Sequence, residues 1–199
     1  MLMNYKNDNK ILLILDVDET LIYATEKKLD RNSDFEIFGY NIYKRPFLDE
    51  FLNAIKDDFL IAIWSSASDE YVNEIIKQII PNDVSLEFIW GRSHCTYKRN
   101  IQTDEYGYYD SEIDNHYHYI KPLKKLKKKG YALNRILIVD DTPHKSKDNF
   151  GNAIYPNAFM GNYADKELLI LSQYLKSFLN SNNVRSIEKR GWQNKYLKP

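Results

Sequence analysis

The stretch Ile-Leu-Leu-Ile-Leu-Asp-Val-Asp-Glu-Thr, residues 11–20, decides how the rest of the chain is interpreted. Its first five residues are all apolar, which suits a strand buried on both faces, as strands of parallel sheets are. Ligands bind beyond the carboxyl ends of such strands, where this stretch places Asp16 and Asp18. Two carboxylates this close repel each other in a dry cleft, and a divalent cation or a shared proton relieves the repulsion. The alternative is a strand followed by an acidic turn without a function.

The overall composition is that of an ordinary folded protein. The chain has 199 residues, of which 43% are hydrophobic and 28% charged, and this predicts a single domain over residues 1–199. Lys plus Arg and Asp plus Glu each total 28, so the net charge is zero, which argues against direct nucleic-acid binding. The lone Cys95 cannot form an internal disulfide, and the Cys/His spacing of a zinc site is missing from the sequence.

The location is also predicted from the sequence. No apolar stretch approaches the roughly 18 residues that a membrane helix needs, so we expect no association with a membrane. A cleaved signal peptide would remove the acidic motif at residues 16–20. We therefore expect an intracellular protein of the cytoplasm or nucleus, while its oligomeric state stays open.

Further apolar runs alternate with helical patterns along the chain. Buried strands are predicted at 59–64, 86–90 and 136–139, and residues 35–42 predict a hairpin around Gly39. Helices are predicted to open at Arg45-Pro46, at Ser68, at Lys121-Pro122 and at about Asp165; the third should end at Gly130. Strands alternating with helices indicate an α/β fold, a Rossmann-like central parallel sheet flanked by helices.

Residues 91–119 interrupt this alternation, and we interpret them as a small β-rich insertion, a hairpin or a short sheet. Its tyrosines either line a substrate approach or occupy half-buried strand positions. His116 and His118 would share a strand face, but two histidines are poor support for a metal site. The lysines between 124 and 129 form a solvated helix face or attract anionic substrates. The basic tail at about 181–199 either packs as an extended arm or frays.

Polar residues follow three of the predicted strands, and the carboxyl ends of parallel strands meet at one edge of a sheet. A carboxylate can attack phosphorus and form an aspartyl phosphate. Mg²⁺ prefers oxygen ligands, and a hydroxyl and an ammonium can hold phosphoryl oxygens in the transition state. Together these groups predict a Mg²⁺-dependent phosphoryl-transfer site, made by Asp16, Asp18, Thr20, Ser65, Ser66, Lys121, Asp140 and Asp141.

The acidic motif at 16–20, Ser65, Lys121 and Asp140-Asp141 resemble the four motifs of the haloacid dehalogenase superfamily. Four ordered stretches, 15–21, 44–52, 119–121 and 138–143, carry a finer match within this superfamily. They are most similar to its small C-terminal-domain phosphatases, also called NLI-interacting-factor-like phosphatases, and the resemblance runs over about residues 11–180. It implies a haloacid dehalogenase-type sheet and phosphomonoester hydrolysis through an aspartyl phosphate. It also implies a phosphoserine or phosphothreonine protein as substrate, as in the RNA polymerase tail.

The resemblance also implies roles for the acidic residues. Asp16 would be the nucleophile and a metal ligand, and Asp18 the general acid and then base, with its backbone carbonyl on the metal. Asp141 would complete the metal site, although many relatives have Asn there, and Asp140 would support Lys121 or the metal's waters. The longer segment at 91–119 is a second departure, and it bears on which substrates have access.

The remaining polar residues would handle the phosphoryl group. Ser65 would bind a phosphoryl oxygen, and Lys121 would neutralise the intermediate. Thr20 and Ser66 are expected to contribute to substrate binding, and the Thr20 hydroxyl to tie the turn of the first motif.

Three other functions stay open from the sequence. The chain could be a small-molecule phosphatase of the same superfamily, which a lid formed by residues 91–119 would favour. It could be a phosphoaspartate receiver domain, although receivers carry their paired acids first in the chain, whereas Asp140 and Asp141 come last here. It could also be a catalytically silent interaction module on the same fold.

Overall fold

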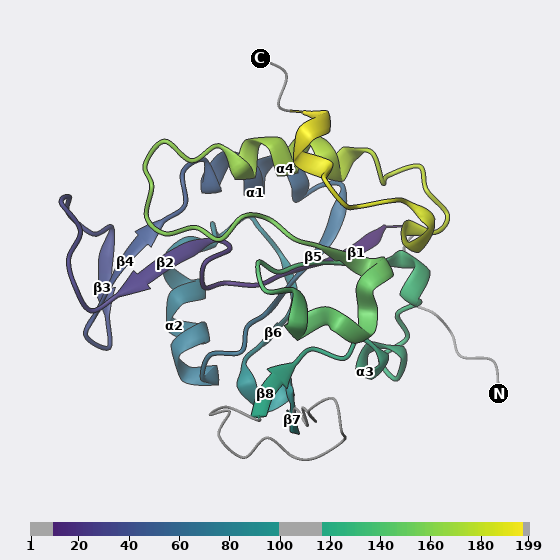
Figure 1. Cartoon of the computed structure of the whole chain (residues 1–199), viewed down its shortest axis with the longest axis horizontal. Helices are drawn as coiled ribbons and strands as arrows, with labels where there is room; N and C mark the ends of the chain where they lie inside the picture. The colour runs from purple at the N-terminus through teal and green to yellow at the C-terminus, as the bar shows by residue number, and fades with distance from the viewer. Residues whose placement is uncertain (1–9, 100–116, 197–199) are drawn as a thin grey trace, which may run out of the picture.

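The computed structural model describes residues 10–99 and 117–196, and its centre is a five-stranded parallel sheet (Figure 1). The strands lie in the order β10-β9-β1-β5-β6, so that β1 is central. Their bounds are Ile11–Leu15 for β1, Phe59–Trp64 for β5, Leu86–Trp90 for β6, Ile136–Val139 for β9 and Ala153–Ile154 for β10. The four predicted strands and the α/β fold class are confirmed, whereas the two-residue β10 was too short to predict.

Helices cover both faces of the sheet. The side chains of β1 alternate between the two apolar cores that these helices form with the sheet. Leu13 and Leu15 pack in the core that includes α1 (Leu48–Ile55), α2 (Asp69–Ile79) and α4 (Glu167–Lys176). Leu12 and Ile14 pack on the other face, in the core that includes α3 (Lys124–Lys127). Burial on both faces explains why the run is apolar without alternation.

Two predicted helix starts are wrong. Helix α1 begins at Leu48 rather than at Arg45-Pro46, because Phe47 has a left-handed backbone (φ 64°) and Arg45 is drawn into the interior. The Arg45 guanidinium donates to the carbonyls of Thr20 and Asn157, at 3.1 and 2.8 Å, and pairs with both oxygens of Asp165. These bonds fix the connection between the strand β4 (Tyr40–Lys44) and α1.

The helix predicted from Lys121 is also shorter than expected, since α3 covers only Lys124–Lys127. Lys121 lies before it, directly after the strand β8 (Tyr117–Ile120). Gly130 ends this region as predicted, with φ +87°, and the Tyr131 amide donates to the Leu126 carbonyl at 3.2 Å. The lysines around α3 are not only a solvated face, because Lys125 Nζ donates to the carbonyls of His94 and Cys95.

A second, antiparallel sheet has the order β2-β4-β3, with β2 at Ile22–Thr25, β3 at Phe35–Ile37 and β4 at Tyr40–Lys44. The predicted β3-β4 hairpin is confirmed: Phe38 (φ 50°) and Gly39 (φ +84°) form its two-residue turn. Strand β2 was not predicted. In Figure 1 this sheet lies to one side of the central sheet, next to α2.

Strand β7 (Thr96–Arg99) pairs antiparallel with β8 (Tyr117–Ile120), so a small β-structure is present within 91–119. Residues 100–116, with His116 and several of the tyrosines, lie outside the described residues, and the domain and insertion boundaries stay predictions. The 3₁₀ segments are η1 Arg92–His94, η2 Leu133–Arg135, η3 Pro143–Asn152, η4 Val184–Ser186 and η5 Trp192–Lys195.

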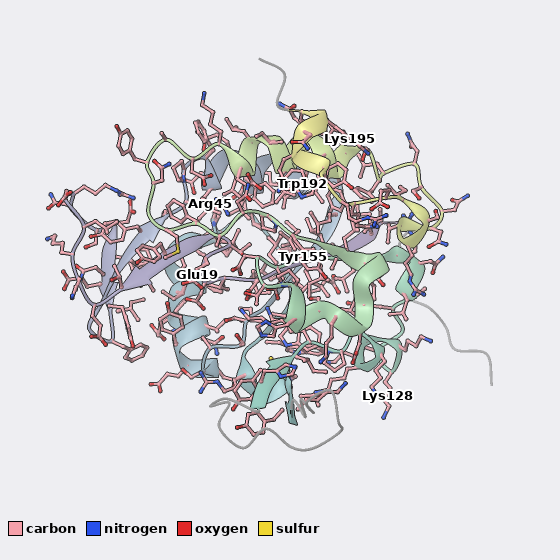
Figure 2. The ribbon with its side chains drawn as sticks, viewed as in Figure 1. Glu19, Arg45, Lys128, Tyr155, Trp192 and Lys195 are labelled. Carbon is pink, nitrogen blue, oxygen red and sulfur yellow. The ribbon has the colours of Figure 1, made fainter. Side chains whose placement is uncertain are left out.

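The described part of the C-terminal tail packs against α4. Trp192 is buried and stacks on Tyr174, with ring centroids 5.2 Å apart, and its indole N–H donates to the Tyr155 carbonyl (Figure 2). This contact holds η5 beside β10 and resolves the choice between packing and fraying for residues up to 196. Within residues 10–99 and 117–196, no helix has the length and apolar character to cross a membrane.

Candidate active site

The parallel register brings three of the predicted residues to one edge of the sheet. Leu15 of β1 lies level with Ile63 of β5 and Val139 of β9, so the residues that follow these strands emerge together. Backbone hydrogen bonds continue past the strand ends: the Asp16, Ser65 and Asp140 amides donate to Val139, Trp90 and Ile154, at 2.9, 2.9 and 3.1 Å. The carboxyl ends of the strands therefore position these side chains.

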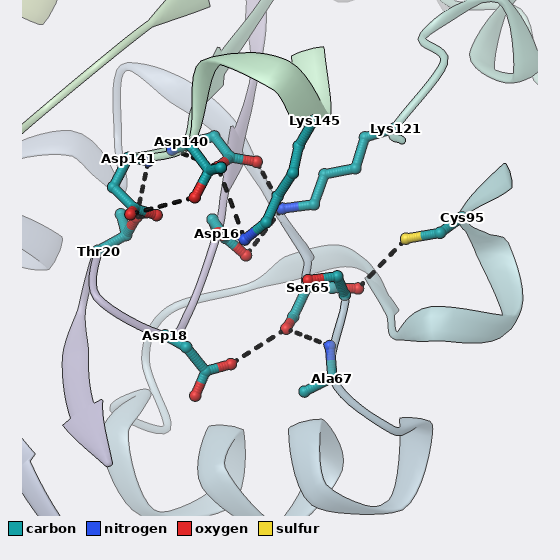
Figure 3. A network of polar contacts seen from close by, with 12 residues as sticks. Asp16, Asp18, Thr20, Ser65, Ala67, Cys95, Lys121, Asp140, Asp141 and Lys145 are labelled. Carbon is teal, nitrogen blue, oxygen red and sulfur yellow. Dashed lines mark hydrogen bonds and ion pairs between the residues drawn. The ribbon is translucent and has the colours of Figure 1, made fainter. Parts of the chain in front are cut away.

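Two lysines neutralise the carboxylates at this edge (Figure 3). Lys121 Nζ lies 2.8 Å from Asp16 Oδ1 and 2.7 Å from Asp140 Oδ2. Lys145 Nζ lies 3.3 Å from Asp16 Oδ2 and 4.0 Å from Asp140 Oδ1. We call these four side chains the ion-pair cluster. Both aspartates and Lys121 are at most 1% exposed, so water does not screen their charges.

The ion-pair cluster shifts the pKa values of its two aspartates in opposite directions. Burial alone would raise the pKa of Asp16, but the ammonium groups of Lys121 and Lys145 outweigh it and hold that pKa below its ordinary value. Burial and the neighbouring charge of Asp16 raise the pKa of Asp140 to about 6. Asp16 is therefore the carboxylate that this site keeps ionised, as a nucleophile must be.

Asp141 lies beside the cluster and is oriented by hydroxyl groups. The Thr20 hydroxyl accepts from the Asp141 amide at 3.3 Å and donates to Asp141 Oδ1 at 3.5 Å, so it does tie the first motif, although to the strand β9 end rather than to its own turn. Thr142 Oγ1 donates to Asp141 Oδ2 at 3.1 Å.

Three carboxylates could hold a metal ion together. Asp16, Asp140 and Asp141 each offer one oxygen, and these oxygens all lie within 4.8 Å of one another. An all-oxygen donor set fits a hard cation such as Mg²⁺. The side chain of Asp18 is not part of this group, which leaves only its backbone carbonyl for the predicted contact with the metal.

The Asp18 carboxyl is held by hydroxyl groups instead. Tyr71 Oη donates to Asp18 Oδ1 at 2.8 Å, and Ser65 Oγ donates to Oδ2 at 3.3 Å while accepting from the Ala67 amide at 3.0 Å. Burial and the charge of Asp16 raise the pKa of Asp18. A carboxyl with a raised pKa next to one with a lowered pKa is the arrangement expected of a general acid beside a nucleophile.

A cleft of about 470 Å³ opens next to Asp18, between α2 and the β2-β4-β3 sheet. Its rim carries Phe38, which is 58% exposed, and Tyr40. Ser66 does not line this cleft; its backbone carbonyl accepts from Arg92 Nε at 2.8 Å, and a role for its hydroxyl stays a prediction. The lining residues are Asp18, Glu19, Ala24, Phe38, Tyr40, Ala67, Ser68, Glu70, Tyr71 and Arg92.

Sequence reasoning missed four residues of this region. Lys145 lies in η3, and nothing in the local sequence distinguishes it from the other lysines nearby. Tyr71 lies in the first turn of α2, and its hydroxyl reaches Asp18. Glu19 has a left-handed backbone (φ 56°), and burial together with the charges of Asp18 and Asp141 raises its pKa to about 7. Arg92, in η1, gave no sequence signal.

The predicted pair of His116 and His118 stays untested, because His116 lies outside the described residues. The His118 ring lies edge-on to His144, with centroids 5.4 Å apart. In the part of the chain that the structure describes, the three aspartates are the group found capable of holding a metal.

The fold and this strand-edge site define a class, the haloacid dehalogenase-type α/β proteins. Solved structures agree: an RNA polymerase II CTD phosphatase, Fcp1, matches with a TM-score of 0.61 and 17% identity over 86% of this chain and 62% of that one. A haloacid dehalogenase-like hydrolase from Xanthomonas campestris matches with a TM-score of 0.53 and 11% identity over 87% of this chain and 97% of that one. At these identities the likeness concerns the fold.

The family model of the NLI interacting factor-like phosphatases matches residues 11–185, and the chain belongs to this family. The CTD small phosphatase-like protein 2 of Dictyostelium discoideum is 28% identical over 88% of this chain and 29% of its own length. The human carboxy-terminal domain RNA polymerase II polypeptide A small phosphatase 1 is 26% identical over 92% of this chain and 64% of its own length. The chain thus spans only part of these relatives.

Proposed function

We propose that this chain hydrolyses phosphoserine or phosphothreonine in proteins, with Mg²⁺, through an aspartyl phosphate on Asp16. The observation that carries the proposal is the placement of two aspartates at one strand end: Asp16 lies against two lysine ammonium groups, and Asp18 borders the open cleft. Asp16 is kept ionised by two ammonium groups, and Asp18, two residues on, has a raised pKa. Membership of a phosphatase family supports the same chemistry.

The residues can divide the reaction between them. An Asp16 oxygen attacks phosphorus and the bond to the substrate oxygen breaks, while the Asp18 carboxyl donates its proton to the departing alcohol. Asp18, now a carboxylate, then takes a proton from water, whose oxygen attacks phosphorus and releases phosphate from Asp16. The Ser65 hydroxyl and the Lys121 ammonium would hold phosphoryl oxygens.

The metal would be held by Asp16, Asp141 and the Asp18 carbonyl, with Asp140 supporting Lys121. When bound there, Mg²⁺ neutralises charge on the phosphoryl oxygens. Asp16 and Asp141 belong to the group of three carboxylates whose oxygens lie within 4.8 Å of one another, which supports their part of this assignment.

The cleft next to Asp18 favours a protein substrate over a small metabolite. It is lined on one side by exposed aromatic side chains, Phe38 and Tyr40, which can receive residues flanking a phosphorylated side chain. The names of several relatives refer to the C-terminal domain of RNA polymerase II, which makes phosphorylated tail peptides the first substrates to try. An intracellular location and a lack of direct nucleic-acid binding stay predictions.

The nucleophile is tested with Asp16→Asn, which keeps the side chain's shape. We expect Mg²⁺-dependent hydrolysis of an aryl phosphate to fall by roughly a thousandfold or more, because the amide cannot form the acyl phosphate. The circular dichroism spectrum should stay that of the wild type. Turnover retained by the folded variant would refute an aspartyl phosphate on this residue.

The substrate class is tested separately, by comparing phosphoserine and phosphothreonine peptides with a panel of phosphorylated metabolites. We expect kcat/KM to be highest for peptides. Turnover of metabolites alone would overturn the protein-substrate proposal and favour the small-molecule alternative.

A further inference from the structure

Lys145 occupies an unusual position for a second lysine of a phosphoryl-transfer site. Its ammonium lies 3.3 Å from Asp16 Oδ2 and 4.0 Å from Asp140 Oδ1, so it faces two of the three carboxylates that could hold a metal (Figure 3). The negative charge of the third carboxylate, Asp141, also raises the pKa of Lys145. Lys121 approaches the same two aspartates through their other oxygens, at 2.8 and 2.7 Å.

The two lysines differ in their freedom to move. The Lys121 side chain is 1% exposed and pairs closely with both aspartates, whereas the Lys145 side chain is 16% exposed and makes the longer contacts. The backbone of Lys145 is fixed, because its amide donates to the Thr142 carbonyl at 3.1 Å and its carbonyl accepts from the Lys121 amide at 2.8 Å. Its side chain therefore has a route to solvent while its attachment point stays in place.

A divalent cation and this ammonium cannot share the site without repulsion. Mg²⁺ binds carboxylate oxygens at about 2.0–2.1 Å, so a cation on Asp16 Oδ2 would lie within roughly 5 Å of Lys145 Nζ. Two positive groups at that distance repel strongly in a partly buried site. One of them must leave, and Lys145 is the one with the route to do so.

We propose that Lys145 is an internal counter-ion that neutralises Asp16 and Asp140 when no metal is bound, competes with the divalent cation, and swings toward solvent when the cation enters. This inference rests on the metal site of the proposed function. Its consequence is that the wild-type chain binds its cation more weakly than the carboxylates alone would. The wild-type chain should accordingly need a higher cation concentration for full turnover than it would without the Lys145 ammonium.

The test measures cation binding directly. Mn²⁺ is titrated into the full chain and the free ion is followed by electron paramagnetic resonance, with Mg²⁺ then added as competitor. We expect Lys145→Met to bind Mn²⁺ and Mg²⁺ about tenfold more tightly than the wild type, because one repelling charge is gone. We expect the same gain in affinity for Lys145→Gln, which replaces the methionine variant in the test if that variant does not fold.

Matched variants separate competition at the site from a general loss of positive charge. Lys145→Arg keeps the charge and should bind as the wild type does, and Lys147→Met removes an exposed lysine of the same segment and should also leave affinity unchanged. Asp141→Asn in the Lys145→Met background should weaken binding, which locates the cation at the aspartates. Unchanged or weaker binding by Lys145→Met, or an equal gain in Lys147→Met, overturns the inference.

The proposed function can fail independently of this inference. If the wild type hydrolyses aryl phosphate with Mg²⁺ while Lys145→Met binds Mn²⁺ no more tightly, only the role of Lys145 is wrong. If no variant binds Mn²⁺ and the wild type has no Mg²⁺-dependent turnover, the metal site itself is wrong and the inference falls with it.

Discussion

The two sides of the candidate site are built in opposite ways. On one side, the ion-pair cluster packs Asp16, Asp140 and Lys121 with at most 1% exposure, and every charge faces an opposite one. On the other side, Asp18 and Glu19 line the open cleft together with aromatic residues. Figure 3 shows the Asp18 carboxyl apart from the ammonium groups of Lys121 and Lys145. One side is fixed by burial, and the other is accessible.

This difference indicates that the two sides contribute differently to stability and to turnover. Breaking a buried ion pair leaves an uncompensated charge, so the cluster constrains folding as well as chemistry. On the cleft side, the Asp18 carboxyl is held by hydrogen bonds from the Tyr71 and Ser65 hydroxyls, and removing one of them costs less free energy. Changes in the cluster should therefore affect stability and turnover together, and changes in the cleft should affect them separately.

The largest expected effect is that of Lys121→Met. It leaves Asp16 and Asp140 in the interior with only the longer contacts to Lys145, and loss of a buried partner costs about 3–5 kcal/mol of unfolding free energy. Urea denaturation in EDTA measures this, with Lys128→Met, an exposed lysine beside α3, as the control. A loss no larger than that of the control would show that the cluster is not what holds this edge together.

An intermediate effect is expected for Tyr71→Phe, which removes only the hydroxyl that donates to Asp18 Oδ1 at 2.8 Å. Together with the bond from Ser65 Oγ to Oδ2, that bond orients the carboxyl that is proposed to protonate the leaving group. We expect kcat/KM for a phosphoserine peptide to fall about tenfold, because an alkoxide leaving group needs the acid. Hydrolysis of a nitrophenyl phosphate, whose leaving group needs no proton, should change by less than about twofold.

Tyr40→Phe is the matched control for this variant. Tyr40 lines the same cleft and meets the Tyr71 ring edge-on, with centroids 6.5 Å apart, but it is not hydrogen-bonded to Asp18. We expect Tyr40→Phe not to lower the rate for the phosphoserine peptide more than the rate for the nitrophenyl phosphate, or the reverse. If both substrates slow equally in Tyr71→Phe, the hydroxyl acts on binding rather than on the general acid.

The sequence predicts the ion-pair cluster better than the cleft, and the reason is physical. A strand buried on both faces must be an apolar run, and a parallel sheet must bring the ends of such runs together, so Asp16, Ser65 and Asp140 follow from local pattern. Lys145 and Tyr71 depend on where η3 and α2 turn their side chains once packed. Neither residue type is unusual at its place in the sequence, so no local signal marks them.

The wrong prediction for the start of α1 also results from contacts that the local sequence does not show. Arg45-Pro46 has the chemistry of a helix start, but Arg45 makes its bonds to Asp165 and Asn157, more than 100 positions away in the chain. Those bonds and the left-handed Phe47 delay α1 to Leu48. A long-range contact of this kind overrides a local preference because the buried guanidinium must find its partners.

The smallest expected effect is that of Glu19→Gln in the cleft, and it depends on pH. The carboxyl has an ordinary pKa of 4.5, and burial with the charges of Asp18 and Asp141 raises the pKa of Glu19 to about 7 in the folded chain. Between these values the folded state holds a proton that the unfolded state has lost, so stability falls as the pH rises from 4.5 to 7.

The cost of the Glu19 charge is thus absent at pH 4 and complete at pH 8. Without metal, Glu19→Gln should stabilise the chain by about 1 kcal/mol at pH 8, after allowance for solvent screening, and hardly at pH 4. Urea denaturation in EDTA at both values measures this, with the exposed Glu70→Gln in the same cleft as the control. An equal gain at both pH values would mean that Glu19 ionises as freely as a surface carboxyl, and that the cleft is wetter than its side chains indicate.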